Sequence, residues 1–460
     1  MHKRARTCLV TAAVTTAIFA AGATALPAHA VEGAPAQKRA LVVVIDFKDV
    51  HHADTDRLKE EARKEYFGGT QSLAGYYTKV SQGAFTYVPA VPEQVVGPYE
   101  LDLNQKPCDP GAVNKATREA LKAAGHVEGE DYDSLSILQP GTGDCKWNGL
   151  ASMPGPTTWA AVGENGDIGK GLLVHEFGHN QGFGHHSRDL CTGGDLARCT
   201  TDGYSGKTPM GGGGSGVGFA APELISRGWL PGGQAITVKK SSTFQLSPLY
   251  GGKPGGVRAL EIPLGKDRLV VEYRHEDPTY RDDDDGILDA AIEGVHAYRV
   301  PEGNYNGSRL IDPTEGKGKG DADAITTLTD AAHQVEVKVV ESGGGSATVA
   351  VAVDGVPAPA KAGSRPTQHT STSTPAPQTQ AAQGTPVPEN DTDAAAPAAA
   401  PSTPAQAAAG HTTKGGTQDL AQTGGSSATP LIAASGAALA ALGAACIYVT
   451  RHRGRGRRRA

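Results

Sequence analysis

The strongest chemical signal in the sequence is a cluster of three histidines within residues 175–185, which read His-Glu-Phe-Gly-His-Asn-Gln-Gly-Phe-Gly-His. On a helix, His175 and His179 share one face because they are four residues apart. Gly182 can adopt a conformation that ends the helix, so that His185 can return as a third nitrogen. Three imidazoles that leave a fourth position for water are typical of a catalytic zinc site.

Glu176 lies beside the His175–His179 pair without having to bind the ion. Bound Zn²⁺ lowers the pKa of a water molecule to about 7 and polarises a carbonyl oxygen. The pattern therefore predicts hydrolysis through a zinc-activated water, with Glu176 as the general base that passes the proton to the leaving group. His186 directly follows His185 and is an alternative third ligand, although the position of Gly182 favours His185.

The full run resembles the metzincin metallopeptidases, whose motif is His-Glu-x-x-His-x-x-Gly-x-x-His followed by a methionine turn. Met210, in Thr208-Pro209-Met210-Gly211, is similar to that methionine, and the alternative is a methionine that only fills core space. Leu41–Phe47, Gly228-Trp229-Leu230 and Val271-Glu272-Tyr273-Arg274 resemble the gametolysin-like branch.

This resemblance implies a zinc endopeptidase that acts on proteins or peptides in a cleft between two subdomains. It assigns His175, His179 and His185 as zinc ligands and Glu176 as the general base. Two features depart from relatives. The position two residues after the methionine is Gly212 instead of tyrosine, and Tyr204 is not assigned in its place. No cysteine lies between residues 30 and 108, so a propeptide cysteine switch is not expected.

The elements around the motif predict an α+β fold. The apolar run 40–47 indicates a buried strand, and 134–138 indicates another. Helices are expected over 55–67, 72–80 and 114–124, and a further helix that begins near residue 172 carries the motif. After residue 235 the pattern changes to short β runs, at 235–238, 258–262, 269–273, 295–300, 335–340 and 347–353. We expect a metzincin-like catalytic domain over 31–234 and a β-rich, sandwich-like domain over 235–355.

Both ends of the chain resemble targeting segments. Residues 1–30 combine Lys3, Arg4 and Arg6 with an apolar run and a small-x-small site at Ala28-His29-Ala30, typical of a cleaved signal peptide. An uncleaved membrane anchor is the alternative. The chain is therefore expected to be exported.

Residues 420–460 combine Leu420-Ala421-Gln422-Thr423-Gly424, an apolar stretch over Leu431–Val449 long enough to span a bilayer, and an arginine-rich end. The pentapeptide resembles the LAxTG cell-wall sorting signal of class E sortases in high-GC Gram-positive bacteria. The resemblance implies a cut between Thr423 and Gly424, attachment to peptidoglycan, and membrane contact only through the tail before sorting. The alternative is a single-pass protein that keeps its tail.

Composition and charge support this organisation. Residues 356–419 contain no aromatic residue, leucine or isoleucine, which predicts a disordered stalk. The formal net charge is −6, and the part between the two basic ends is more acidic still, so nucleic acid is not an expected partner. Four cysteines of the exported part form an even set, and their neighbourhood favours the pairs Cys108–Cys145 and Cys191–Cys199.

Two further interpretations stay open. The run Asp282–Asp285 before Gly286 is acidic enough to suggest a Ca²⁺ site, but it does not fit the EF-hand pattern, and a solvated acidic loop is favoured.

For function, the main expectation is a secreted, wall-anchored zinc endopeptidase. The alternative is a surface adhesion protein with a degenerate metzincin domain, which the intact ligand set with Glu176 argues against. A zinc hydrolase of non-peptide bonds is the third candidate.

Overall fold

The computed structural model describes residues 35–360, apart from 142–144, 146, 164, 253–254, 277–291 and 315–323, and the backbone of 420–424. The signal segment 1–30, the acidic run 282–285, the stalk residues 361–419 and the tail beyond 424 lie outside the described residues. Apart from Pro35, the described residues belong to one compact unit that begins at Ala36. None of the described helices combines the length and the apolar composition of a membrane-spanning segment.

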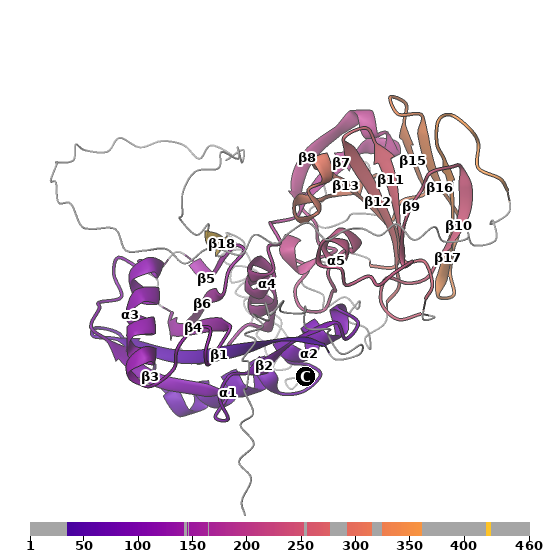
Figure 1. The fold of residues 1–460 in the computed structure, drawn as a ribbon. Coiled ribbons are helices and arrows are strands. Elements are labelled where there is room, and N and C mark those ends of the chain that lie inside the picture. The colour runs from indigo at the N-terminus through magenta and orange to yellow at the C-terminus, as the bar shows by residue number, and fades with distance from the viewer. Residues whose placement is uncertain are drawn as a thin grey trace, which may run out of the picture. The chain divides into compact units, whose positions relative to one another are not determined.

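The first sheet has seven strands (Figure 1). β1 lies inside it and pairs in parallel with β2, β3 and β4, and β4 pairs in parallel with β6. β5 is antiparallel to β6, and β18 is antiparallel to β5. The strands are β1 (Ala36–Phe47), β2 (Phe85–Pro89), β3 (Val95–Leu101), β4 (Ser134–Pro140), β5 (Trp147–Ser152), β6 (Thr157–Val162) and β18 (Leu420–Gly424).

The apolar run of β1 is buried on both faces, which confirms the prediction of a buried strand. Because side chains alternate along a strand, Val42 and Val44 belong to one apolar cluster and Val43 and Ile45 to another. The first cluster includes side chains of α1 (Thr55–Phe67), α2 (Leu73–Val80) and α4 (Lys170–Asn180). The second includes side chains of α3 (Pro110–Ala123). The sheet is thus covered on both faces.

The helices begin where side chains can accept hydrogen bonds from the free N–H groups of a first turn. Asp54 caps α1 and Ser72 caps α2, at the starts expected from the sequence. α3 begins at Pro110, four residues earlier than the predicted range 114–124. The reason is that Asp109 caps it and Pro110 occupies its first turn, where the missing N–H costs nothing.

The β-rich region has two sheets whose buried side chains share one core, as expected for a sandwich. The larger sheet runs in the order β8-β7-β14-β13-β12-β11-β9, and the smaller in the order β10-β17-β16-β15. Their strands are β7 (Ser187–Cys191), β8 (Cys199–Tyr204), β9 (Ala235–Thr237), β10 (Ser242–Leu246), β11 (Ala259–Leu264), β12 (Asp267–Arg274), β13 (Gly294–Val300), β14 (Arg309–Asp312), β15 (Thr327–Asp330), β16 (Val335–Gly343) and β17 (Ser346–Ala352).

The larger sheet also contains two strands that follow directly on the histidine motif. β14 pairs in parallel with β7, and β7 pairs with β8. Short helical elements complete the described structure: α5 (Ala221–Arg227), η1 (Thr192–Gly194), η2 (Leu196–Arg198), η3 (Pro209–Gly211), η5 (Pro301–Gly303) and η6 (Tyr305–Gly307). The chain on either side of residue 235 is therefore joined by backbone pairing in one sheet.

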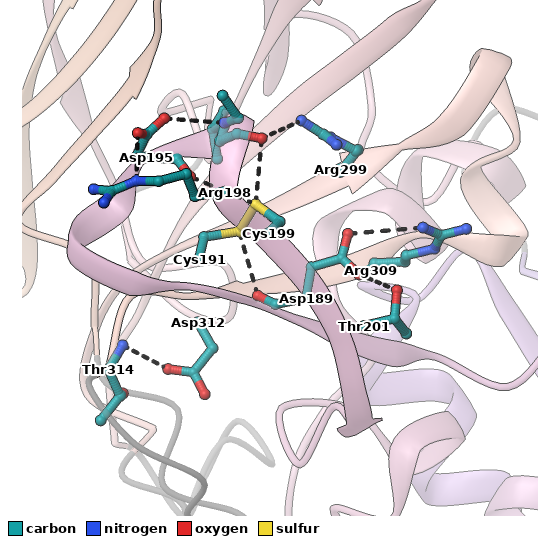
Figure 2. Close-up of a disulfide and its surroundings, with 12 residues drawn as sticks. Asp189, Cys191, Asp195, Arg198, Cys199, Thr201, Arg299, Arg309, Asp312 and Thr314 are labelled. Carbon is teal, nitrogen blue, oxygen red and sulfur yellow. Dashed lines mark hydrogen bonds and ion pairs between the residues drawn. A yellow bond between two sulfur atoms is a disulfide. The ribbon is translucent and has the colours of Figure 1, made fainter.

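Both predicted disulfides are present, Cys108–Cys145 and Cys191–Cys199. Figure 2 shows the second of them, which links two residues directly opposite each other in β7 and β8. Beside it, the buried carboxylate of Asp189 accepts a hydrogen bond from Thr201 and lies 3.8 Å from the guanidinium of Arg309. These contacts hold the start of the β-rich sheet just after the histidine motif.

Candidate metal centre and active site

α4 positions the first two histidines of the motif. The helix is buried from Leu173 to Asn180, packs against β5 and β6, and ends before Gly182, whose φ is +92° as the helix-ending role requires. Phe177 anchors its apolar face, with its ring 4.8 Å from that of Tyr87 in an edge-to-face contact. The opposite face is thereby fixed toward the site.

The structure brings His175, His179 and His185 together. One ring nitrogen from each lies within 4.8 Å of the others, and the ring centroids are 4.7 to 5.2 Å apart. In the described residues this is the one such group of histidine, cysteine or carboxylate side chains. His175 and His179 are buried and His185 is exposed, so the cluster is open to solvent on one side.

Backbone carbonyls set the tautomers of the two buried imidazoles. The Nδ1 of His175 lies 2.8 Å from the carbonyl oxygen of Pro209, and the Nδ1 of His179 lies 2.7 Å from that of Phe183. A carbonyl only accepts, so each Nδ1 carries the proton and each Nε2 keeps its lone pair. Both Nε2 atoms are buried without a hydrogen-bond partner. Two Nε2 lone pairs without a hydrogen-bond partner, next to the imidazole of His185, fit the coordination of a divalent zinc ion.

Burial also keeps these imidazoles neutral, as a metal ligand must be. It lowers the pKa of His175 to about 4 and that of His179 to about 3. The pKa of His185 is lowered for the same reason. The two helix-borne imidazoles therefore bind no proton at pH 7 that a metal would have to displace.

The structure places His186, the alternative ligand, outside the group. Its side chain is fully buried, with Nδ1 3.2 Å from the hydroxyl of Ser308. Its Nε2 is 3.6 Å from Glu223. Burial lowers the pKa of His186 to about 3 and raises that of Glu223 to about 8, so both groups are neutral at pH 7 and form no ion pair. His186 supports the fold behind the site.

Met210 occupies the position expected of a methionine turn. It lies in η3, is fully buried, and its sulfur packs so closely on α4 that a Cβ at Gly178 would be 2.4 Å from it. The turn also contacts the histidine segment through its backbone. The carbonyl of Met210 accepts a hydrogen bond from the N–H of His186, and the carbonyl of Pro209 accepts one from Nδ1 of His175. The turn thus fixes the orientation of His175.

A buried polar network beneath this turn was not predicted from the sequence. The hydroxyl of Thr208 donates to Glu223, whose carboxyl also accepts from the N–H of Ala220. Arg274 of β12 donates to the carbonyl of Lys207 and pairs with Glu272. In the sequence, residues 271–274 stand out only through their resemblance to the gametolysin-like branch, and no sequence pattern links them to residue 208. The β-rich region therefore helps to hold the methionine turn.

Tyr204, at the end of β8, lies beside the histidine group. It is 65% exposed, and its ring centroid is 6.3 Å from that of His185. The structure therefore places an exposed aromatic ring at the open side of the histidine group, at a position to which the sequence assigned no role.

Glu176 lies against β5. A Cβ built on Gly149 would be 2.5 Å from Oε1 of Glu176 and 2.7 Å from Cδ1 of Leu172, so only glycine leaves room for this carboxylate. No sequence pattern selects Gly149 as a site residue, because Asn148-Gly149 is typical of a turn and not of a strand.

We expect Gly149→Ala to lower kcat/KM for peptide cleavage by roughly 10- to 100-fold, because the added methyl group displaces the carboxylate of Glu176. A displacement of about 1 Å in a catalytic group can lower the rate by about 100-fold. The measurement is the initial rate of cleavage with zinc content determined in parallel. Gly163→Ala is the control, because a Cβ there meets nothing within 4 Å. Equal rates for the two variants would contradict the role of Gly149.

Comparisons with known proteins are consistent with this site. Residues 39–263 match the model of the gametolysin peptidases, M11. No curated protein matches the chain. Two crystal structures of wild-type OgpA from Akkermansia muciniphila are similar to this chain, each with a TM-score of 0.28. The first is 12% identical in sequence, and the match covers 60% of this chain and 91% of the OgpA chain. The second is 14% identical, and the match covers 60% of this chain and 87% of the OgpA chain.

A third similar structure is catalytically inactive OgpA from the same organism in complex with an O-glycopeptide (glycodrosocin) substrate. It is 14% identical, covers 52% of this chain and 72% of its own, and has a TM-score of 0.27. At TM-scores this low, the likeness carries no argument about substrate. The family model matches just under half of the chain, but that part includes the histidine triad, Glu176 and Met210. The match and the triad support a metallopeptidase, and residues 39–263 are similar to the gametolysin peptidases of family M11.

Proposed function

We propose that the chain is a secreted, cell-wall-anchored zinc endopeptidase of the metzincin type that cleaves extracellular proteins or peptides. The observation that carries the proposal is the convergence of three imidazole nitrogens within 4.8 Å. The match of residues 39–263 to a peptidase family supports the peptide bond as the substrate class. Export and anchoring are supported by the sequence features at the two ends of the chain.

His175, His179 and His185 would hold the zinc ion through ring nitrogens. When bound, zinc would lower the pKa of a water molecule to about 7 and polarise the carbonyl of the scissile bond. Glu176 would accept a proton at its carboxylate and return it to the nitrogen of the departing amine. Gly149 leaves the space for that carboxylate, and the carbonyl of Pro209 keeps the proton of His175 on Nδ1.

The proposal is tested by cleavage of casein, an unfolded protein substrate, by the purified chain. We expect cleavage to stop when the chain is treated with a chelator and to return when one equivalent of Zn²⁺ is added, because the ion supplies the Lewis acid. Peptide mapping of the fragments shows whether internal bonds are cut. A zinc-loaded chain that cleaves no protein would contradict the proposal and favour the adhesion alternative.

A further inference from the structure

Without residues 420–424, β5 would be the end strand of the first sheet, because the strand order there is β18-β5-β6. An end strand presents a row of free N–H and C=O groups that can pair with another extended chain. We propose that this edge of β5 is the binding surface for the chain's own residues Leu420–Gly424, and that their pairing competes with substrate. The competition rests on the proposed function, whereas the pairing does not.

The pairing is specific in register. Leu420 lies opposite Ser152, Gln422 opposite Leu150 and Thr423 opposite Gly149, in the antiparallel sense. The register shifts after Thr423, and the pairing ends at Trp147. The segment therefore covers β5 from one end to the other.

The sequence of β5 leaves this edge open. Natural edge strands are commonly protected by lysine, proline or inward-pointing charges. Trp147–Ser152 reads Trp-Asn-Gly-Leu-Ala-Ser and contains none of these residues. Leu420–Gly424 likewise contains no charge and no proline that would oppose pairing. Neither strand thus carries a feature that prevents addition of an extended chain.

The edge of β5 also leads past the proposed general base. Gly149 is the residue whose Cβ would collide with Glu176, and α4 contacts both β5 and β18. Thr423 is the residue directly opposite Gly149. An extended chain on this edge therefore passes the position where a scissile bond would have to lie. A protein substrate and the segment 420–424 would need the same row of backbone groups.

The connection to the rest of the chain favours this contact. Sixty-seven residues separate the end of β17 from Leu420, and the sequence predicts a disordered stalk over most of them. A connection of this length with the disorder that the sequence predicts would give residues 420–424 an effective concentration on the order of 1 mM at β5. The same five residues are the predicted sorting signal, so they cannot pair with β5 and be held extended by a sortase at the same time. Docking of residues 420–424 therefore lowers the rate of substrate cleavage several-fold without abolishing it, and transfer of the segment to a sortase raises that rate.

Backbone hydrogen exchange of the full chain tests the pairing without reference to activity. In an edge strand successive N–H groups point to opposite sides, so Ala421→Pro together with Gln422→Pro removes one N–H that faces β5. The matched control is Ala421→Val with Gln422→Thr, which keeps both N–H groups and favours a strand. All chains carry Glu176→Gln, so that none is altered by its own cleavage.

We expect the N–H groups of Trp147–Ser152 that face away from β6 to exchange at least about tenfold faster in the double-proline chain than in the control. The N–H groups that face β6 serve as an internal reference and should not change. Exchange that is identical in the proline chain, the control and the parent would overturn the proposal.

The second readout is casein cleavage by the same chains with Glu176 intact. The double-proline chain should cleave several-fold faster than the control, because its edge is free for substrate. If exchange changes but no chain cleaves casein, the proposed function fails while the pairing stands. If exchange changes and all chains cleave at one rate, or if the segment itself is cut between 420 and 424, the competition is overturned.

Discussion

We expect Glu176→Gln to lower kcat for casein cleavage by about 10²- to 10⁴-fold, the range that loss of general acid–base catalysis costs. Glutamine has nearly the shape of glutamate, so it fits the space that Gly149 leaves, but its amide cannot accept a proton at neutral pH. The three imidazoles are untouched, and the zinc content should stay near one per chain. Initial rates and elemental analysis on the same preparation measure both quantities.

Glu119→Gln is the matched control, because this carboxylate is exposed on α3, far along the chain from the motif. Its rate and zinc content should equal those of the unmodified chain. A Glu176→Gln chain that cleaves casein at the unmodified rate would exclude this carboxylate as the general base. A chain that has lost its zinc would show instead that Glu176 supports the metal.

Replacement of His185 should affect zinc binding, whereas replacement of the adjacent His186 should affect stability. His185→Ala removes one of the three converging nitrogens, so zinc affinity should fall and cleavage should be lost. Loss of a residue that only hydrogen-bonds to a metal ligand costs about 10- to 100-fold in metal affinity, and loss of the ligand itself should cost more. His186→Ala should keep zinc but lower the free energy of unfolding by about 1–3 kcal/mol, because Ser308 loses a buried partner.

Zinc titration and thermal unfolding of both variants separate these outcomes. A chain that loses zinc through His186→Ala and keeps it through His185→Ala would make His186 the third ligand. The comparison also controls for folding, because His186 is the more deeply buried of the two and its replacement should disturb the fold more.

The parts of the fold that the sequence predicts well have strong local periodicity. The charged helix 55–67, the buried run in β1 and the strands 269–273 and 347–353 each appear within a few residues of their expected bounds. Strands that contain turn-like residues were not predicted. Examples are β3, which contains Gly97-Pro98, and β5, which contains Asn148-Gly149. Pairing within the sheet overrides the local preference of these segments.

In the candidate site, too, the residues of the local motif are predicted from the sequence and their distant partners are not. The motif itself specifies the helix and the glycine bend, so the convergence of His175, His179 and His185 follows from their spacing. The partners that orient the site come from distant segments. Arg274 lies 67 residues beyond Lys207, whose carbonyl it binds. Such contacts depend on which distant segments of the chain pack together, which no local pattern contains.

Zinc-edge anomalous diffraction from crystals of the zinc-loaded chain tests the central claim most directly. The account predicts one strong anomalous peak between the Nε2 atoms of His175 and His179 and a ring nitrogen of His185, with Glu176 outside the ligand set. A peak elsewhere, or an ion bound without His185, would contradict it.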